Sequence, residues 1–423
     1  MKRHFQFFAY PLLLLFLFSG STVLFAQDTT QYIVPGRLND SSQLNKPYVI
    51  LISADGFRYD FAKNHHANNL LKFAENGVEA ASMQPSFPSL TFPNHYSIAT
   101  GLYPSHHGIV DNRFYDFKKD KFYSISNKKI VGDGSWYGGE PIWVLAERHK
   151  MLSASFFWVG SEAAIDHVRP TYYYNYTEAF SIDKRLDVLQ DWLKMPADMR
   201  PHLITFYFPE VDHAAHAHGI NSKETGDAVK LLDDAIEKMN AMCAQTGLPI
   251  NFIFVSDHGF VDVDTVNTLQ VPSFIDTSKF IISTGSTMVH LYAKDSSAIL
   301  SSYNSIKKVQ NGYQTYLANE VPEKWHYGKK DDRYNRIGDI ILVADLAKVF
   351  YSRGRKNPAT HGFDNYTQEM QATFYAWGPA FKQHLKIDRF ENVNIYPLIA
   401  HILGLSFDYK IDGNLNVLKG ILK

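Results

Sequence analysis

The sequence predicts an α/β fold with a mainly parallel central sheet and helices on both faces. Three continuous apolar segments, residues 47–53, 202–208 and 250–256, lack the polar alternation of half-exposed strands. Such segments are typical of parallel strands that are buried on both sides. Segments with helical apolar spacing separate them, and repeated alternation of strands and helices places helices on both faces of a sheet.

The remaining elements follow the same alternation. Residues 68–76 are predicted to form a helix that Gly77 ends. Residues 91–100 are predicted to form a helix with Pro93 in its first turn, where proline is tolerated. Further helices are expected over residues 140–149, 182–193, 224–244 and 393–403, and further strands over residues 152–158 and 371–376. Residues 261–355 are polar and rich in Lys and Asp, which predicts a smaller inserted cap region.

The N-terminus predicts a targeting segment. Lys2, Arg3 and His4 precede an apolar stretch that ends near Ala26, which is typical of a secretory signal peptide over residues 1–26. We expect cleavage after Ala26 and a periplasmic or secreted protein with no stable membrane span after processing. A permanent membrane anchor is the alternative, because the stretch approaches the length of a span. A lipid-anchored protein is not expected, because the leader contains no cysteine.

Cysteine content and net charge narrow the classes of function. Cys243 is the only cysteine among 423 residues, so an internal disulfide is excluded. Its place in a segment with helical apolar spacing predicts a buried, inert thiol. The formal net charge is −1, which argues against a nucleic-acid groove, because affinity for DNA or RNA depends on clustered positive charge. The 18 histidines are the compositional feature that needs an explanation.

Candidate metal ligands lie close behind the predicted strands. Polar residues at the carboxyl ends of parallel strands meet at one edge of the sheet. Two of the candidates are four residues apart and share a face if their segment is helical. Two others are adjacent and can approach a metal from different sides. The six candidates are Asp55, Asp212, His216, Asp257, His258 and His361.

Aspartates and histidines together suit Zn²⁺. Six ligands exceed the needs of one tetrahedral ion but fit two, and a pair of metal ions can clamp the attacking and leaving oxygens of a phosphoryl transfer. Taken singly, an aspartate after a strand is more often a turn or helix-cap residue than a metal ligand. The hypothesis of two zinc ions therefore depends on the whole set.

Thr91 is the candidate nucleophile. It stands where a loop meets the predicted helix over residues 91–100. Free backbone N–H groups and the positive end of the helix dipole favour a phosphate and an alkoxide at this position. The alternative is that Thr91 only caps the helix.

Several segments of the chain match a family pattern. They are ISADGFRYD, PSFPSLTFPNHYSIATGLYPSHHGIVDNRFYD, GEPIW, FFWVGSE, EVDHAAHAHG, VSDHG and the late HGF. In these segments the chain resembles the nucleotide pyrophosphatase/phosphodiesterase family of the alkaline phosphatase superfamily. The resemblance extends from about Pro47 to the C-terminus and is weakest over residues 261–355. It implies an alkaline-phosphatase-like fold and a phosphodiesterase catalytic domain over residues 47–423, as in bacterial members. Residues 27–46, which precede this domain, are expected to form a polar lead.

The resemblance also implies roles for individual residues. One zinc ion would be held by Asp212, His216 and His361, and the other by Asp55, Asp257, His258 and the oxygen of Thr91. A covalent phospho-threonine intermediate is implied. Asn112 matches the asparagine that binds a phosphate oxygen. The further substrate-binding residues that the resemblance implies are Phe92, Trp158, Glu162, Tyr176 and Tyr207; the aromatic ones are otherwise explained as core residues.

The sequence therefore predicts an exported zinc-dependent nucleotide pyrophosphatase/phosphodiesterase, with a small phosphodiester or nucleotide as substrate. A phosphodiesterase for choline-type or lysophospholipid substrates and a phosphate monoesterase are the close alternatives. An aromatic cage also suits a quaternary ammonium group. A non-catalytic phosphate- or sugar-binding protein on the same fold is the third hypothesis, and the intact set of Thr91 and six ligands argues against it. The sequence leaves the oligomeric state open.

Overall fold

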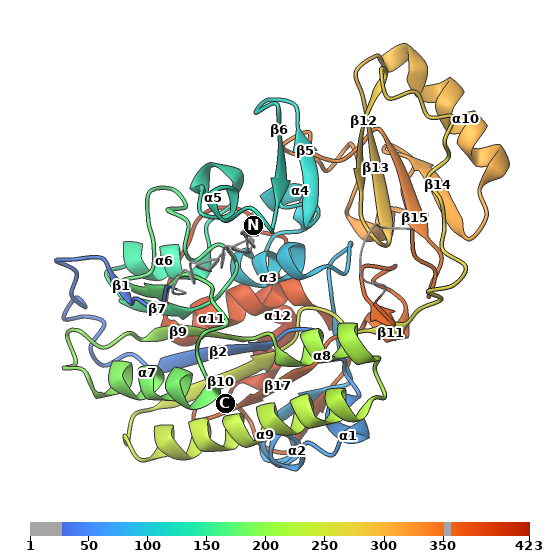
Figure 1. The fold of residues 1–423 in the computed structure, drawn as a ribbon. Helices are drawn as coiled ribbons and strands as arrows, with labels where there is room; N and C mark the ends of the chain where they lie inside the picture. Colours follow the sequence, from blue (N-terminus) through green and yellow to red (C-terminus); the bar gives the residue numbers. More distant parts are fainter. Residues whose placement is uncertain (1–27, 351–356) are drawn as a thin grey trace, which may run out of the picture.

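A nine-stranded sheet forms the centre of the computed structural model, which describes residues 28–350 and 357–423 (Figure 1). The predicted signal peptide lies outside the described residues. Within the sheet, only β1 and β17 run antiparallel to their neighbours, so the predicted α/β fold with a mainly parallel sheet is confirmed. In spatial order the strands are β1 (Tyr32–Ile33), β8 (Tyr172–Tyr174), β7 (Ser153–Phe156), β9 (Leu203–Phe208), β2 (Tyr48–Ala54), β10 (Ile250–Val255), β17 (Phe374–Trp377), β3 (Val78–Ala80) and β18 (Leu385–Ile387).

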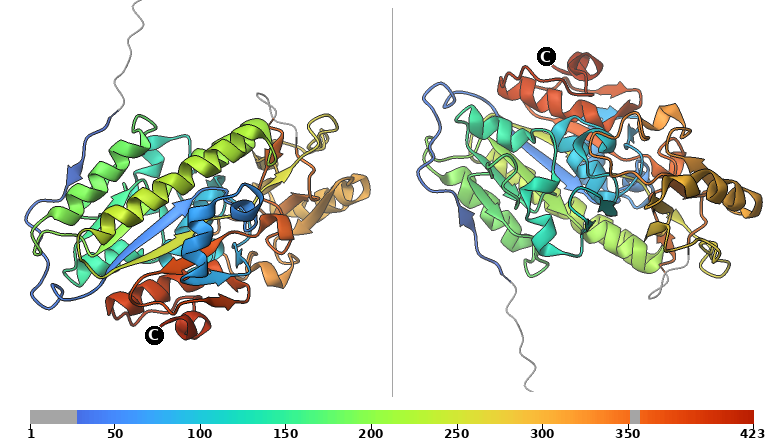
Figure 2. Two further views of the ribbon diagram at one scale, coloured as in Figure 1. Left: turned by 90° about the horizontal axis from the view of Figure 1, so that it is seen from below. Right: turned by 90° about the horizontal axis from the view of Figure 1, so that it is seen from above.

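Helices cover both faces of this sheet, as Figure 2 shows in two views. Alternate side chains of β2 enter different cores: Ile50 and Ile52 pack with α7 and α9, whereas Val49 and Leu51 pack with α3, α6 and α11. All seven residues of β2 are buried, as expected for a strand covered on both sides. The helices are α1 (Phe61–Asn64), α2 (Asn68–Glu75), α3 (Thr91–Thr100), α4 (Pro104–His107), α5 (Lys128–Val131), α6 (Ile142–Arg148), α7 (Ile182–Lys194), α8 (Glu210–His218), α9 (Lys223–Ala244), α10 (Ile299–Val309), α11 (Ile395–Leu403) and α12 (Leu415–Leu418).

A second, four-stranded antiparallel sheet stands beside the main one (Figure 1). It lies inside the segment that was expected to form an inserted cap, and α10 packs on it with its own apolar core. The domain boundaries stay a prediction. The strands of this sheet are β12 (Phe280–Thr284), β13 (Met288–Ala293), β15 (Ile340–Ala344) and β14 (Tyr313–Leu317).

Three two-stranded sheets complete the described strands. They pair β11 (Val261–Asp262) with β16 (Ala359–Thr360), β19 (Phe390–Glu391) with β4 (Met83–Gln84), and β5 (Arg113–Asp116) with β6 (Lys121–Ser124).

The helix over Thr91–Thr100 was predicted with correct bounds, whereas the strand expected over residues 371–376 was misplaced. It spans Phe374–Trp377 instead, because its register is set by pairing with β10 and β3 rather than by its own apolar pattern. The short strands β1, β3, β8 and β18 were not predicted, since two or three residues carry too little periodicity. Within residues 28–350 and 357–423, no helix combines the length and apolar character needed to cross a membrane.

Candidate active site

The candidate ligands converge because three central strands are neighbours. Strand β2 pairs in parallel with both β9 and β10. Asp55 directly follows β2, and Asp257 lies just past the end of β10. Helix α8 begins just after β9 and carries Asp212 and His216 on one face, as their spacing predicted. The carboxyl ends of these strands therefore bring the ligands to one edge of the sheet.

A glycine makes the tight turn after β2 possible. Gly56 has a φ of 66°, and a Cβ atom there would lie 2.4 Å from the ring of Phe260. The N–H group of Gly56 donates a hydrogen bond of 3.1 Å to Asp257 Oδ1. The turn that positions Asp55 thus also orients Asp257.

In each of the three carboxylates, one oxygen faces the site without a hydrogen bond. Among the described residues, Asp55 Oδ1, Asp212 Oδ1 and Asp257 Oδ2 are buried and accept none. Two of the opposite oxygens are held: Tyr207 donates to Asp55 Oδ2 at 2.6 Å, and Gly56 donates to Asp257 Oδ1. A buried acceptor without a donor is costly unless a cation binds it.

The three histidines are oriented by backbone carbonyls. Nδ1 of His216 lies 2.9 Å from the carbonyl of Ala359, and Nδ1 of His361 lies 2.9 Å from that of Ser89. Nδ1 of His258 lies 3.1 Å from the carbonyl of Gly259. A carbonyl accepts a hydrogen bond, so Nδ1 carries the hydrogen and Nε2 is left as the free ligand atom in each ring.

The free ligand atoms gather in two adjoining clusters. His361 Nε2 lies 3.2 Å from His216 Nε2 and 3.7 Å from Asp212 Oδ1, and His216 Nε2 lies 3.5 Å from the same oxygen. His258 Nε2 lies 2.9 Å from Asp257 Oδ2 and 3.5 Å from Asp55 Oδ1.

His258 links the two clusters. Its ligand atom also lies within 4.8 Å of those of Asp212 and His361, and its ring stacks on that of His361 at 3.5 Å. Free carboxylate oxygens and imidazole Nε2 atoms at these separations fit a binuclear metal site.

Burial and neighbouring charges shift the pKa values of the candidate ligands. Burial, together with the charges of Asp257 and Asp212, raises the pKa of Asp55 well above its usual value. Burial alone would also raise the pKa of Asp257, but His258 and His95 hold it well below its usual range. Burial lowers the pKa of His361, and the nearby His258 and His216 lower it further. A neutral imidazole is the form that binds a metal.

Thr91 begins α3 beside the second cluster, with Oγ1 3.3 Å from His258 Nε2. Asn112 reaches the same helix end, because its Oδ1 accepts a hydrogen bond of 3.1 Å from the N–H group of Phe92. That contact leaves the amide NH₂ of Asn112 free to donate. A hydroxyl, a helix N-terminus and a free amide donor form a suitable setting for a phosphoryl group.

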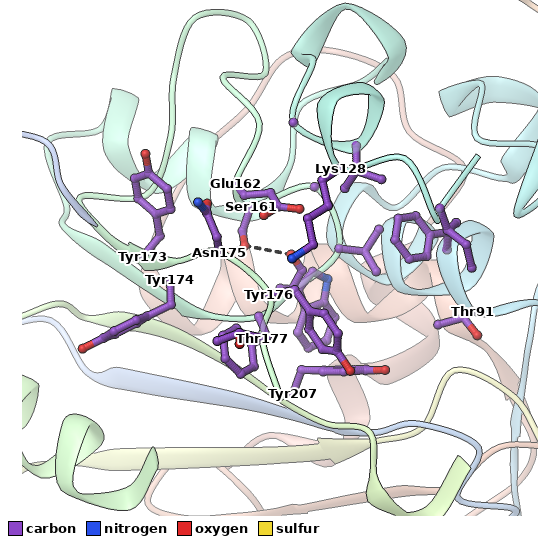
Figure 3. Close-up of a pocket in the computed structure, with 18 of the residues that line it drawn as sticks. Thr91, Lys128, Ser161, Glu162, Tyr173, Tyr174, Asn175, Tyr176, Thr177 and Tyr207 are labelled. Carbon is purple, nitrogen blue, oxygen red and sulfur yellow. Dashed lines mark hydrogen bonds between the residues drawn. The ribbon is translucent and has the colours of Figure 1, made fainter. Parts of the chain in front are cut away.

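Five of the six predicted substrate-binding residues line a cavity of about 910 Å³ that reaches the candidate ligands Asp55 and Asp212. Figure 3 shows Thr91 at one end of it and Tyr173 and Asn175 at the other. Tyr176 and Tyr207 lie between these ends. The lining also includes Phe92, Trp158 and Glu162, whereas Asn112 lies outside it.

The cavity lining combines aromatic rings with a few polar groups. The rings of Tyr176 and Tyr207 meet edge to face at 6.1 Å. Burial raises the pKa of Glu162, although the N–H group of Tyr176 donates to its carboxylate. Trp158 is 2% exposed and donates from Nε1 to the carbonyl of His95. Aromatic faces with a few polar groups suit a planar, polar ligand.

Sequence reasoning missed two residues of the site. His95 is fully buried at its centre, and the signal that could have revealed it was its position four residues after Thr91 on the same helix. Lys128 lines the cavity (Figure 3), but nothing in its sequence neighbourhood distinguishes it from other exposed lysines.

Fold and site together fit a hydrolase that works with two metal ions. The sequence profile described as type I phosphodiesterase / nucleotide pyrophosphatase matches residues 49–367. The chain therefore belongs to this family and is a hydrolase of the nucleotide pyrophosphatase/phosphodiesterase type.

Individual relatives agree with this assignment. Mouse ectonucleotide pyrophosphatase/phosphodiesterase family member 1 is 32% identical over 382 residues, which cover 86% of this chain and 41% of the mouse protein. An uncharacterized pyrophosphatase/phosphodiesterase of Schizosaccharomyces pombe is 33% identical over 393 residues, 88% of this chain and 80% of that protein. The chain thus spans less than half the length of the mouse relative.

Solved structures share the fold. Murine ectonucleotide pyrophosphatase/phosphodiesterase 5 superposes with a TM-score of 0.82 at 26% identity, covering 89% of this chain and 100% of that one. An inactive threonine-to-alanine variant of the same murine protein, in complex with AMP, gives a TM-score of 0.83 at 25% identity over 89% of this chain and 100% of that one.

Proposed function

We propose that the protein is a zinc-dependent nucleotide pyrophosphatase/phosphodiesterase that works through a phospho-threonine intermediate. The observation that carries the proposal is the convergence of three imidazole Nε2 atoms and three unpartnered carboxylate oxygens beside Thr91. Zinc ions, when bound, would supply Lewis-acid chemistry that lowers the pKa of a hydroxyl group and stabilises charge on a leaving oxygen.

Thr91 is the proposed nucleophile. Its oxygen attacks phosphorus, a P–O bond to the leaving group breaks on the opposite side, and the phosphoryl group with its nucleoside remains on Thr91. Water then attacks the same phosphorus, the bond to Thr91 breaks, and a nucleoside monophosphate leaves. The free NH₂ group of Asn112 donates to a non-bridging oxygen, where negative charge builds up in both steps.

The cavity supports a nucleotide as the substrate. Phe92 and Tyr176 offer aromatic faces for a base, and Glu162 offers a half-buried carboxylate for its polar edge. The murine structure in complex with AMP, which is an inactive threonine-to-alanine variant, is similar over 89% of this chain. The AMP complex supports a nucleotide as the ligand of the cavity, and the inactive variant supports a threonine nucleophile.

The experiment that tests this function compares three nitrophenyl substrates. The proposal expects a nitrophenyl nucleotide diester to give the highest kcat/KM, above nitrophenyl phosphate and nitrophenyl phosphorylcholine. A preference for the monoester would refute the diesterase function. A preference for the choline ester would replace the nucleotide by a quaternary ammonium substrate.

We also propose that the protein is exported and loses residues 1–26. N-terminal sequencing of the mature protein tests this, with Gln27 expected as the first residue. Retention of Met1 in membrane-bound protein would favour the anchor instead.

A further inference from the structure

We infer that His95 is a positioning residue that holds the nucleophile and one metal cluster in register; the inference rests on the proposed function. His95 lies in α3, four residues after Thr91, and its side chain is fully buried. Its Nδ1 lies 3.0 Å from the carbonyl of Thr91 and 3.3 Å from Asp257 Oδ2. Both neighbours are acceptors, so Nδ1 carries a hydrogen and faces the two groups together.

The other edge of the ring is anchored in the sheet. Nε2 of His95 lies 2.8 Å from the hydroxyl of Ser53 in β2. The ring also meets those of Trp158 and Tyr207 edge to face, each at 5.2 Å. One imidazole thus joins β2, the start of α3 and the ligand that follows β10.

The contact with His95 affects a candidate metal ligand, Asp257. The oxygen of Asp257 that faces His95 is the same one that faces His258 Nε2 at 2.9 Å. Removing His95 lets this carboxylate turn and lets the first turn of α3 move relative to the ligands. Partners of metal ligands that are themselves not ligands contribute about 10- to 100-fold to metal affinity or activity.

The test compares His95→Phe with His107→Phe. His107 is also fully buried and packs against α3, where Nε2 lies 3.0 Å from Ser97 Oγ, but its contacts include no metal ligand. Zinc affinity is measured by competition with a chromophoric chelator, and the visible spectrum of the cobalt-substituted protein reports ligand geometry. His95→Phe should weaken affinity at least about tenfold and change the spectrum, whereas His107→Phe should alter only thermal stability. Equal zinc affinity and equal spectra in the two variants would overturn the role of His95.

A second pair of variants covers the case in which His95→Phe does not fold. Asparagine places its NH₂ group near the position of Nδ1, and glutamine places it near Nε2. His95→Asn should therefore retain zinc affinity and kcat better than His95→Gln. The reverse order, or no difference, would overturn the inference. A parent protein that binds zinc but shows no preference for a nucleotide diester would instead refute the proposed function.

A separate observation concerns the outer end of the cavity, which the N-terminal arm (residues 28–33) completes. Strand β1 in this arm pairs with β8, and the ring of Tyr32 stacks on that of Tyr173 at 5.2 Å. Gln31 Oε1 accepts hydrogen bonds from Trp192 Nε1 at 3.0 Å and from the hydroxyl of Tyr174 at 3.2 Å. The arm is therefore attached to the sheet by backbone and side-chain contacts.

The arm adds a carboxylate to the cavity. Asp28 lines it together with Tyr173 and Asn175. The carboxylate accepts hydrogen bonds from the hydroxyl of Tyr32 at 2.7 Å and from the N–H group of Thr30 at 3.0 Å, and the side chain of Asn175 also donates to it. The arm lies outside residues 49–367, the part of the chain that matches the family profile.

We propose that the arm forms a recognition site for the amino group of a nucleobase; this also rests on the proposed function. The cavity volume of about 910 Å³ lies near the upper end of the ~300–1,000 Å³ range of small-ligand pockets, which leaves room for a base that reaches the outer end. The carboxylates of Asp28 and Glu162 line this cavity as hydrogen-bond acceptors, which suits a heterocycle that donates hydrogen bonds.

CTP and UTP provide a matched test, because they differ at an amino or a carbonyl group on rings of equal size. The parent protein should prefer CTP, and Asp28→Asn should lower this preference about three- to tenfold, mainly through KM. Asp40→Asn is the control, because Asp40 lies in the same lead and holds only its own turn at Ser42. An unchanged ratio in Asp28→Asn would overturn the recognition site. Failure of the parent protein to cleave either nucleotide would refute the proposed function instead.

Discussion

The hydroxyl of Tyr207 donates a hydrogen bond of 2.6 Å to Asp55 Oδ2, which leaves Asp55 Oδ1 facing the second ligand cluster. Tyr207 was predicted to contact the substrate through its ring, and this contact adds a function for its hydroxyl. Tyr207→Phe keeps the ring and removes the donor. We expect zinc affinity to fall about tenfold with little change in KM for a nucleotide diester.

Tyr174→Phe is the control for this measurement. Tyr174 lines the same cavity, but its hydroxyl donates to Gln31 instead of a metal ligand. Unchanged zinc affinity in Tyr207→Phe would contradict this role of the hydroxyl, and a rise in KM alone would show that the hydroxyl acts on the substrate and not on the metal ligand.

Thr91→Ala should abolish turnover and leave zinc binding nearly intact. The variant removes the proposed nucleophile, whereas the other ligands of the second cluster remain. A decrease in kcat of more than about a thousandfold is expected for loss of a nucleophile. Thr91→Ser retains a hydroxyl and should keep measurable activity. Near-normal turnover by Thr91→Ala would refute the nucleophile assignment.

Asn112→Asp separates the two ends of the amide group. The carboxylate can still accept from the N–H group of Phe92, but it cannot donate to a phosphate oxygen and it adds a negative charge. We expect kcat/KM to fall about 100- to 1,000-fold while the thermal unfolding temperature stays near that of the parent protein. Asn112→Ala should lower both activity and stability. Activity equal to the parent in Asn112→Asp would contradict the role in charge stabilisation.

Removal of metal should inactivate the protein and lower its stability. Burial raises the pKa of Asp55, and repulsion from the carboxylates of Asp257 and Asp212 raises it further. A cation that binds the folded state stabilises it in proportion to the logarithm of its concentration. The measurement is thermal unfolding and activity before and after chelation, with zinc restored afterwards. Full activity after demonstrated metal loss would refute the mechanism.

Cys243 should react only when the protein unfolds. Its side chain is 2% exposed in α9, and burial raises the pKa of the thiol to about 12. The thiolate is the reactive form, and at pH 8 it is far scarcer at this pKa than in an exposed cysteine. A thiol reagent should label the native protein slowly and label one thiol rapidly in denaturant. Rapid labelling of the native protein would contradict the predicted inert thiol.

Strand order and short strands could not be predicted from the sequence. The buried strands β2, β9 and β10 were predicted because residues covered on both faces must all be apolar. The antiparallel direction of β17 leaves no trace in its own composition, because either direction buries the same side chains. The two-residue strand β1 is likewise defined by its partner β8.

The sequence by itself determined the α/β class, the family and the ligand types, because these depend on apolar periodicity and on motifs carried by single segments. Only the tertiary structure decided which atoms face one another. The backbone carbonyls of Ala359, Ser89 and Gly259 select Nε2 of each histidine as the ligand atom. Partners such as His95 and Asp257 are 162 residues apart in the chain, and only the packing of α3 against the carboxyl ends of β2 and β10 brings them within 3.3 Å.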